Sequence, residues 1–265
     1  MKVNLKINDQ PVSVEAGSTI LQAAEELEIR IPTLCHFQMD CFNLEHRNGS
    51  CRVCVVEVEG RPNLAPACST PVAEGMVVHT NTLRAINARR TILDLLLSDH
   101  PKDCLTCPKN LNCQLQALAQ ELGLHHLLFK GEQSTYNRDL SSKAIARDLD
   151  KCIMCRRCET ACGTVQTVGV LSGVGRGFRA VVAPAGLKPL AETECVFCGQ
   201  CVQVCPVGAL SEMDYKYPVW RALNDSTKTV VVQTAPAVRV AIGEAFGLEP
   251  GSISTGRMVT ALRML

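Results

Sequence analysis

The chain has 265 residues, a net charge of +1 and only 4% aromatic residues. This length allows two or three small domains. The balanced charge gives no electrostatic reason to expect nucleic acid or an anionic membrane as a partner. The sequence has no apolar run of membrane-spanning length and no apolar signal-peptide core after Met1, so we expect no membrane insertion. With so few aromatic residues, small domains need cross-links to be stable.

The cysteines decide the class of protein, because the chain has sixteen of them. A secreted scaffold of disulfides is one interpretation, but the spacing favours metal ligation. Fifteen cysteines and one histidine fall into four sets of ligands with iron–sulfur spacing. Iron–sulfur clusters need reduced thiols, so we expect a cytoplasmic location. The sequence therefore predicts a protein that moves single electrons.

Residues 1–80 have the pattern of a small sheet with one helix. Alternating apolar residues predict a strand over 3–7 and another over 53–58. Between them, Ser18 or Thr19 can cap a helix. This order of elements resembles the β-grasp fold of plant-type ferredoxins.

The first ligand set lies in this domain and consists of Cys35, Cys51, Cys54 and Cys68. Its spacing resembles the plant-type pattern for a 2Fe–2S cluster, with a longer first gap. A structural zinc site is the alternative, since a C-x2-C pair alone is common. The predicted strands and helix around the set favour 2Fe–2S. Cys41 falls outside the pattern, and we expect a free thiol near the site.

Residues 81–130 predict two helices with three cysteines between them. The second ligand set is His100, Cys104, Cys107 and Cys113. A neutral imidazole in place of a thiolate makes a 4Fe–4S cluster less negative and should raise its potential. A zinc site with one histidine and three cysteines is the alternative. The other candidate histidines read as ordinary surface residues: His79, His125 and His126.

Residues 131–145 are polar and predict a linker. Residues 146–214 contain the run C-x2-C-x2-C-x3-C twice, at Cys152, Cys155, Cys158 and Cys162 and at Cys195, Cys198, Cys201 and Cys205. The glycines between the runs lack dinucleotide-binding spacing, so we expect turns there.

This duplication resembles the bacterial two-cluster ferredoxins, in which the fourth cysteine of each run ligates the other cluster. The resemblance implies one 4Fe–4S set of Cys152, Cys155, Cys158 and Cys205. It implies a second 4Fe–4S set of Cys195, Cys198, Cys201 and Cys162. Pro206 after the second run fits this pattern, whereas Gly163 after the first run departs from it.

Residues 215–265 contain no cysteine. Val230-Val231-Val232 predicts a buried strand, and the segments 236–246 and 257–265 predict helices. One strand and two helices cannot enclose a core. We therefore expect the start of a further domain that is incomplete in this chain.

The order of the four motifs resembles two families. One is the large iron–sulfur subunit of respiratory complex I, with related formate dehydrogenases. The other is the electron-transfer half of FeFe hydrogenases. Residues 231–239 and 256–259 resemble the opening of the hydrogenase catalytic domain, and 195–201 also resembles that family.

The hydrogenase resemblance implies an α+β chain with one 2Fe–2S cluster and three 4Fe–4S clusters. It implies an electron-transfer module of an NADH- and ferredoxin-linked, electron-bifurcating hydrogenase, with ferredoxin and a flavin–NADH subunit as partners. That family carries its H-cluster on later cysteines, and none follows Cys205. We therefore predict no catalytic residue here and no hydrogen turnover by this chain alone. The alternatives are a complex I-like or formate dehydrogenase subunit, and a non-catalytic electron carrier.

Overall fold

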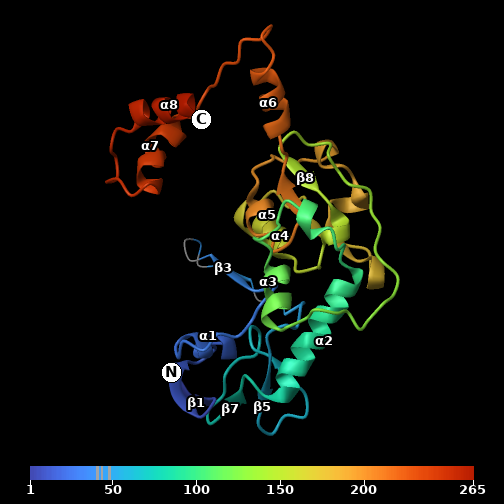
Figure 1. Ribbon diagram of the computed structural model, residues 1–265. Helices are drawn as coiled ribbons and strands as arrows, with labels where there is room; N and C mark the ends of the chain where they lie inside the picture. The colour runs from blue at the N-terminus through green and yellow to red at the C-terminus, as the bar shows by residue number, and fades with distance from the viewer. Residues whose placement is uncertain (40–41, 43, 47–48) are drawn as a thin grey trace. The chain divides into compact units, whose positions relative to one another are not determined.

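The computed structural model describes residues 1–39, 42, 44–46 and 49–265. The chain has a mixed α/β structure that divides into two compact units, Met1–Met213 and Asp214–Leu265 (Figure 1). In the described part of the chain, no helix combines the length and the apolar character needed to cross a membrane. Cys41 lies outside the described residues, so the free thiol expected there stays a prediction.

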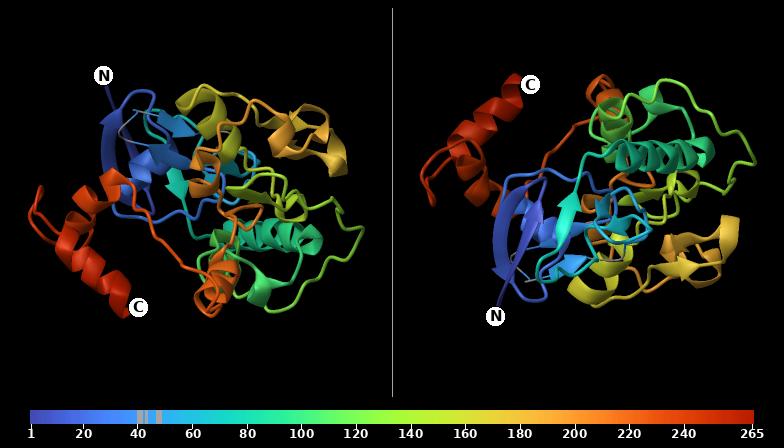
Figure 2. Two further views of the ribbon diagram at one scale, coloured as in Figure 1. Left: turned by 90° about the horizontal axis from the view of Figure 1, so that it is seen from above. Right: turned by 90° about the horizontal axis from the view of Figure 1, so that it is seen from below.

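The first unit begins with a five-stranded sheet, drawn in blue to teal in Figures 1 and 2. Its strand order is β2-β1-β7-β5-β6, with β1 and β7 parallel and the other neighbours antiparallel. The strands are β1 (Lys2–Ile7), β2 (Gln10–Glu15), β5 (Val55–Val58), β6 (Ala65–Pro66) and β7 (Val77–His79).

The predicted strand over 3–7 is confirmed, since its apolar side chains are buried and its polar ones are exposed. Helix α1 (Ile20–Glu25) begins after Thr19, whose side chain accepts a hydrogen bond from the Gln22 amide. The Gln22 side chain in turn accepts a bond from the Thr19 amide, which completes a capping box. The strand predicted over 53–58 begins only at Val55.

A short hairpin stands apart from this sheet. It consists of β3 (Phe37–Met39) and β4 (Leu44–His46), in which Phe37 is paired with His46. Their rings stack with centroids 5.2 Å apart and an interplanar angle of 25°. This hairpin begins two residues after Cys35.

Both helices predicted over 81–130 are present, as α2 (Leu83–Asp99) and α3 (Gln114–Glu121). A short 3-10 turn, η2 (Cys104–Thr106), lies between them. Arg89 of α2 is 3% exposed and donates to the carbonyl oxygens of Val55 and Thr80, at 2.9 and 2.7 Å. These bonds hold α2 against β5.

We expect Arg89→Ala to lower the free energy of unfolding by about 3 kcal/mol, because two buried carbonyl groups lose a charged donor. Urea denaturation of the cluster-loaded chain, followed by circular dichroism, measures this. Arg30→Ala is the control, since Arg30 and Glu121 form an exposed ion pair, and it should cost less than about 1 kcal/mol. Equal losses for both variants would contradict the anchoring role.

The segment predicted as a linker is anchored to the rest of the unit. The Ser134 amide donates to Asp99 Oδ1 at 2.5 Å, and the Tyr136 amide donates to Asp150 Oδ1 at 2.6 Å. No helix or strand occurs between 131 and the start of β8 at Ile145. The segment is therefore irregular, as predicted, but it is tied to its neighbours.

The remainder of the first unit surrounds the duplicated cysteine runs. Strand β8 (Ile145–Arg147) pairs antiparallel with β11 (Leu210–Glu212), which joins the two ends of the segment. Each run contains a short helix, α4 (Arg157–Thr160) or α5 (Gln200–Gln203). The short helical turns are η3 (Leu149–Lys151), η4 (Ala161–Val165), η5 (Gly177–Arg179), η6 (Ala185–Leu187) and η7 (Leu190–Glu192).

The Gly-rich gap contains a hairpin of β9 (Ser172–Val174) and β10 (Val181–Ala183) that was not predicted. The expected turn is confirmed at Gly175, which has a φ of +78°. A Cβ at Gly175 would lie 2.7 Å from the carbonyl oxygen of Arg179. Only glycine fits there without a shift of the backbone.

The second unit contains three helices: α6 (Lys216–Leu223), α7 (Pro236–Ala245) and α8 (Thr255–Met264). The two predicted helices are confirmed, while α6 was not predicted. The strand predicted at Val230-Val231-Val232 is wrong, because these residues are irregular and exposed. A strand needs a neighbour for its backbone groups, and residues 214–265 contain no other strand.

Candidate metal centres

The first ligand set converges at the edge of the five-stranded sheet. Cys51 and Cys54 flank a turn before β5, Cys68 follows β6, and all four thiols, including Cys35, are buried. Cys54 Sγ lies 3.4 Å from Cys68 Sγ. Cys35 in turn is hydrogen-bonded to Cys51 and Cys68. The fold thus brings together four sulfurs that come from three separate segments of the chain.

Hydrogen bonds between these thiols lower the pKa values of two of them and raise those of the other two. Bonds from Cys51 and Cys68 hold the pKa of Cys35 far below its ordinary value, and the bond from Cys68 lowers the pKa of Cys54 to about 7. The pKa values of Cys51 and Cys68 are raised, because each donates to Cys35. Cysteines bind metals as thiolates, so metal binding at this site would release the thiol protons.

Three members of the second set line one pocket. His100 ends α2, Cys104 begins η2 and Cys113 precedes α3, and all three face a pocket that Leu97, Leu115 and Leu124 also line. Burial, followed by the positive Lys151, lowers the pKa of His100 below its ordinary value. The imidazole is then neutral at neutral pH, which is the form that binds metals.

Cys107, the fourth member of this set, lies against Gly208 of the duplicated segment. A Cβ at position 208 would be 2.5 Å from Cys107 Sγ. The Gln114 amide also donates to the carbonyl oxygen of Pro206, at 2.9 Å. The second set therefore adjoins the Cys-Pro end of the second run.

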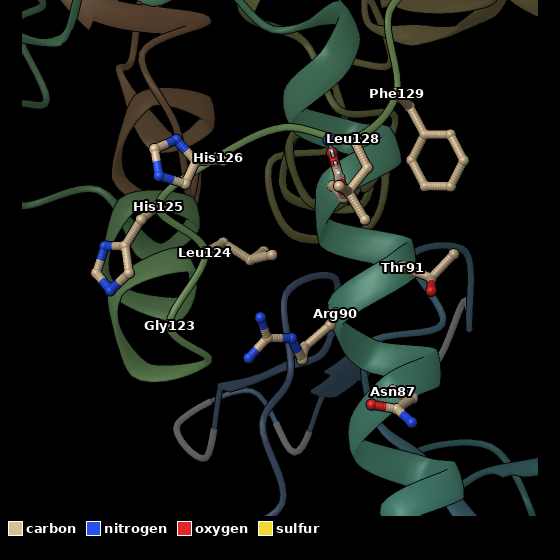
Figure 3. A pocket seen from close by; sticks show the side chains of 10 residues that line it. Asn87, Arg90, Thr91, Gly123, Leu124, His125, His126, Leu128 and Phe129 are labelled. Carbon is tan, nitrogen blue, oxygen red and sulfur yellow. Dashed lines mark hydrogen bonds between the residues drawn. The ribbon is translucent and has the colours of Figure 1, made fainter.

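The two other histidines of this region are exposed, as the sequence predicted. Figure 3 shows a pocket with Asn87, Arg90 and Thr91 of α2 on one side and His125 and His126 on the other. His125 also lines the pocket that His100 shares with two cysteines. His125 is therefore the alternative to His100 as the histidine ligand of this site.

The structure places the fourth cysteine of each run with the other run. Burial, and then Cys205 and Cys152, raises the pKa of Cys155 to about 12. Burial raises the pKa of Cys201 to about 12, and three nearby thiols contribute to this shift: Cys195, Cys198 and Cys162. Cys201 and these three cysteines also line one cavity together with aliphatic residues, among them Leu171, Leu190 and Leu210.

The chemistry of these donors fits iron–sulfur clusters. Buried thiols with raised pKa values resist ionisation unless a cationic partner is present, and clustered iron ions supply that charge. No group of three His, Cys, Asp or Glu side chains among the described residues is compact enough to hold a single metal ion. The grouping and burial of the thiols are therefore what fits these residues to iron–sulfur clusters. The ligands of each cluster stay a prediction.

Three residues that the sequence did not single out connect the first ligand set with the cysteine run that begins at Cys152: His46, Phe37 and Arg157. His46 of β4 bonds to Cys155 O at 3.0 Å through Nε2 and to Thr160 Oγ1 at 2.7 Å through Nδ1. Arg157 donates to the carbonyl oxygen of His36 at 2.6 Å and lies over the Phe37 ring. These contacts join residues more than 100 positions apart, so no local pattern could reveal them.

Four known families match consecutive parts of the chain. Residues 1–83 match the 2Fe-2S iron-sulfur cluster binding domain, and 89–127 match the NADH-ubiquinone oxidoreductase-G iron-sulfur binding region. Residues 190–211 match the 4Fe-4S binding domain. Residues 228–265 match the C-terminal domain of the iron-only hydrogenase large subunit.

Individual relatives agree with these matches. The NADP-reducing hydrogenase subunit HndD of Solidesulfovibrio fructosivorans is 58% identical over 99% of this chain and 45% of its own length. An NADH-quinone oxidoreductase subunit of Rhizobium meliloti is 39% identical over 81% of this chain and 24% of its own. A crystal structure of an NAD+-reducing [NiFe]-hydrogenase in the H2-reduced state aligns with a TM-score of 0.71 and 28% identity. That alignment covers 79% of this chain and 87% of the other.

The chain spans less than half the length of these two sequence relatives. The hydrogenase relative matches nearly the whole chain, whereas the NADH-quinone oxidoreductase relative matches 81% of it. The hydrogenase family match also covers residues 228–265 of the cysteine-free tail. The chain is therefore related to the large subunits of iron-only hydrogenases and to the iron–sulfur subunits of NADH-quinone oxidoreductases.

Proposed function

We propose that the first unit holds one 2Fe–2S cluster and three 4Fe–4S clusters and relays single electrons between them. When bound, such clusters accept and donate one electron at a time. The observation that carries this proposal is the grouping of the predicted thiols in sites built from distant segments. The 2Fe-2S and 4Fe-4S family matches support the cluster types.

The proposed ligands are the four sets expected from the sequence. Cys35, Cys51, Cys54 and Cys68 would hold the 2Fe–2S cluster, and His100, Cys104, Cys107 and Cys113 the first 4Fe–4S cluster. The other two clusters would be held by crossed sets: Cys152, Cys155, Cys158 and Cys205, and Cys195, Cys198, Cys201 and Cys162. The position of Cys205 beside Cys155 and of Cys162 beside Cys201 supports the crossing.

The proposed domain limits follow the same sets. Residues 1–80 would form a β-grasp domain, which the mixed sheet with one parallel pair supports. Residues 81–130 would form the helical domain with His100, and 146–214 the two-cluster domain. Residues 215–265 would begin a hydrogenase catalytic domain, as the family match over 228–265 supports.

For the whole protein, we propose a role in a hydrogenase that exchanges electrons with other redox subunits. The name of the HndD relative, an NADP-reducing hydrogenase subunit, supports a nicotinamide-linked partner. We propose a flavin–NADH subunit and ferredoxin as the electron partners, electron bifurcation as the reaction type, and the cytoplasm as the location. The second candidate is a subunit of an NADH-quinone oxidoreductase, which the match over residues 89–127 favours.

Anaerobic reconstitution tests the cluster content directly. We expect about 14 iron atoms and an equal amount of acid-labile sulfide per chain, the sum for one 2Fe–2S and three 4Fe–4S clusters. Iron, sulfide and zinc analyses combined with EPR of the reduced chain measure this. One zinc atom per chain in place of a cluster would overturn the assignment of that site.

A further inference from the structure

Arg157 is a buried guanidinium beside two of the proposed cluster sites. It is the first residue of α4, directly before Cys158, and is 5% exposed. Its Nη2 donates to the carbonyl oxygen of His36 at 2.6 Å, and its Cζ lies 5.7 Å from the Phe37 ring centroid. The side chain is therefore held by the segment that follows Cys35.

The charge of Arg157 has no carboxylate partner among the described residues, where none of the ion pairs includes it. Its Nε is buried and has no hydrogen-bond partner there. The acidic residue of the same helix, Glu159, pairs instead with the more exposed Arg156, at 2.6 Å. An unpaired buried charge is costly, so a negative group should be present beside Arg157 in the working protein.

Cysteines of two proposed sites lie close enough to Arg157 to interact with its charge. Burial lowers the pKa of Arg157, and four thiols oppose this shift: Cys155, Cys35, Cys51 and Cys205. Cys35 and Cys51 belong to the proposed 2Fe–2S set, and Cys155 and Cys205 to a proposed 4Fe–4S set. A guanidinium keeps its charge at neutral pH.

The surrounding contacts keep this arrangement rigid. His46, stacked on Phe37, bonds to the carbonyl oxygen of Cys155 and to Thr160. The β3–β4 hairpin of the 2Fe–2S region is thereby attached to both ends of the segment that carries Arg157. The guanidinium has little freedom to turn toward solvent.

We propose that Arg157 is a shared positive charge that raises the reduction potentials of the 2Fe–2S site at Cys35 and Cys51 and of the 4Fe–4S site at Cys155 and Cys205. This inference rests on the proposed function. Each site gains negative charge when it takes up one electron, and a fixed positive charge in a low-dielectric surrounding offsets that cost. The buried Nε hydrogen would be available as a donor to a cluster sulfur, and such a bond would act in the same direction. Arg157 would act on the clusters through its charge and its Nε hydrogen.

Potentiometric EPR titration of the whole reconstituted chain tests this role. At a fixed solution potential, Arg157→Gln should lower the ratio of reduced to oxidised centre about tenfold, or about 59 mV. The shift should occur in the 2Fe–2S signal and in one 4Fe–4S signal. Arg156→Gln is the matched control, because Arg156 is adjacent, more exposed and already paired with Glu159. It should leave every potential unchanged.

Arg157→Lys keeps the charge and removes the Nε donor, so the same two signals should shift in the same direction by a smaller amount. This variant decides the question if Arg157→Gln fails to load its clusters. Unchanged potentials in a fully loaded Arg157→Gln variant would overturn the inference, as would an equal shift of all signals in either variant. A wild-type chain that lacks the expected iron would instead overturn the proposed function.

Discussion

Removal of iron is expected to unfold residues 146–214 and to leave the N-terminal sheet folded. The core around the duplicated runs includes the proposed ligands themselves, with Cys155, Cys158, Cys201 and Cys205 among its buried residues. Only the short β8–β11 pair joins the ends of this segment. Metal binding in such small domains contributes on the order of 10 kcal/mol of folding free energy.

The N-terminal sheet has a different source of stability. Its core is mainly aliphatic, with Ile7, Ile20, Val56 and Val78 fully buried. At about 25 cal/mol per Å² of apolar surface, such burial stabilises a fold without metal. The sheet is therefore an internal control within the same molecule.

Hydrogen–deuterium exchange of the cluster-loaded and chelator-treated chains measures the difference. Amides of 146–214 should lose protection by several orders of magnitude after chelation, while those of β1 and β7 should keep most of theirs. Retained protection across 146–214 in iron-free protein would show that the cysteines are not the main source of its stability.

Substitution of His100 is expected to change the potential of one cluster in a predictable direction. His100→Cys adds a thiolate, which makes the cluster more negative by one charge and should lower its reduction potential. The half-buried position of His100, at the end of α2 and in one pocket with Cys104 and Cys113, lets a cysteine occupy the same place. His100→Ala removes the fourth ligand, so the cluster should lose iron readily.

EPR redox titration of wild type and His100→Cys measures the shift, and iron release to a chelator measures the lability of His100→Ala. His125→Ala is the strictest control because His125 lines the same pocket. His126→Ala is a second control, since His126 is exposed. Both controls should behave as wild type. A labile cluster in His125→Ala with a normal one in His100→Ala would reassign the ligand.

The sequence by itself determined the features that depend on local spacing. The cysteine runs, the strand over 3–7 and the two helices around the second set are all local patterns, because side-chain alternation and ligand loops involve nearby residues. The resemblance of the tail to hydrogenases also came from contiguous residues, and the family match over 228–265 agrees with it.

Local spacing failed where a partner decides the conformation. Val230-Val231-Val232 has the composition of a buried strand, yet it is exposed, because nothing in residues 214–265 pairs with it. The β9–β10 hairpin was not predicted, because its glycines are typical of a loop. The pairing of the two strands, which local sequence does not show, makes this segment a hairpin.

Only the tertiary structure decided how the sites are connected. Arg156 and Arg157 are indistinguishable in the sequence, but Arg156 pairs with Glu159 whereas Arg157 is buried beside cysteines from two sites. His46 has no ligand spacing, yet it joins the hairpin after Cys35 to the carbonyl oxygen of Cys155. Burial and Coulombic interaction depend on distance in space, and residues 109 to 121 positions apart meet only when the chain folds.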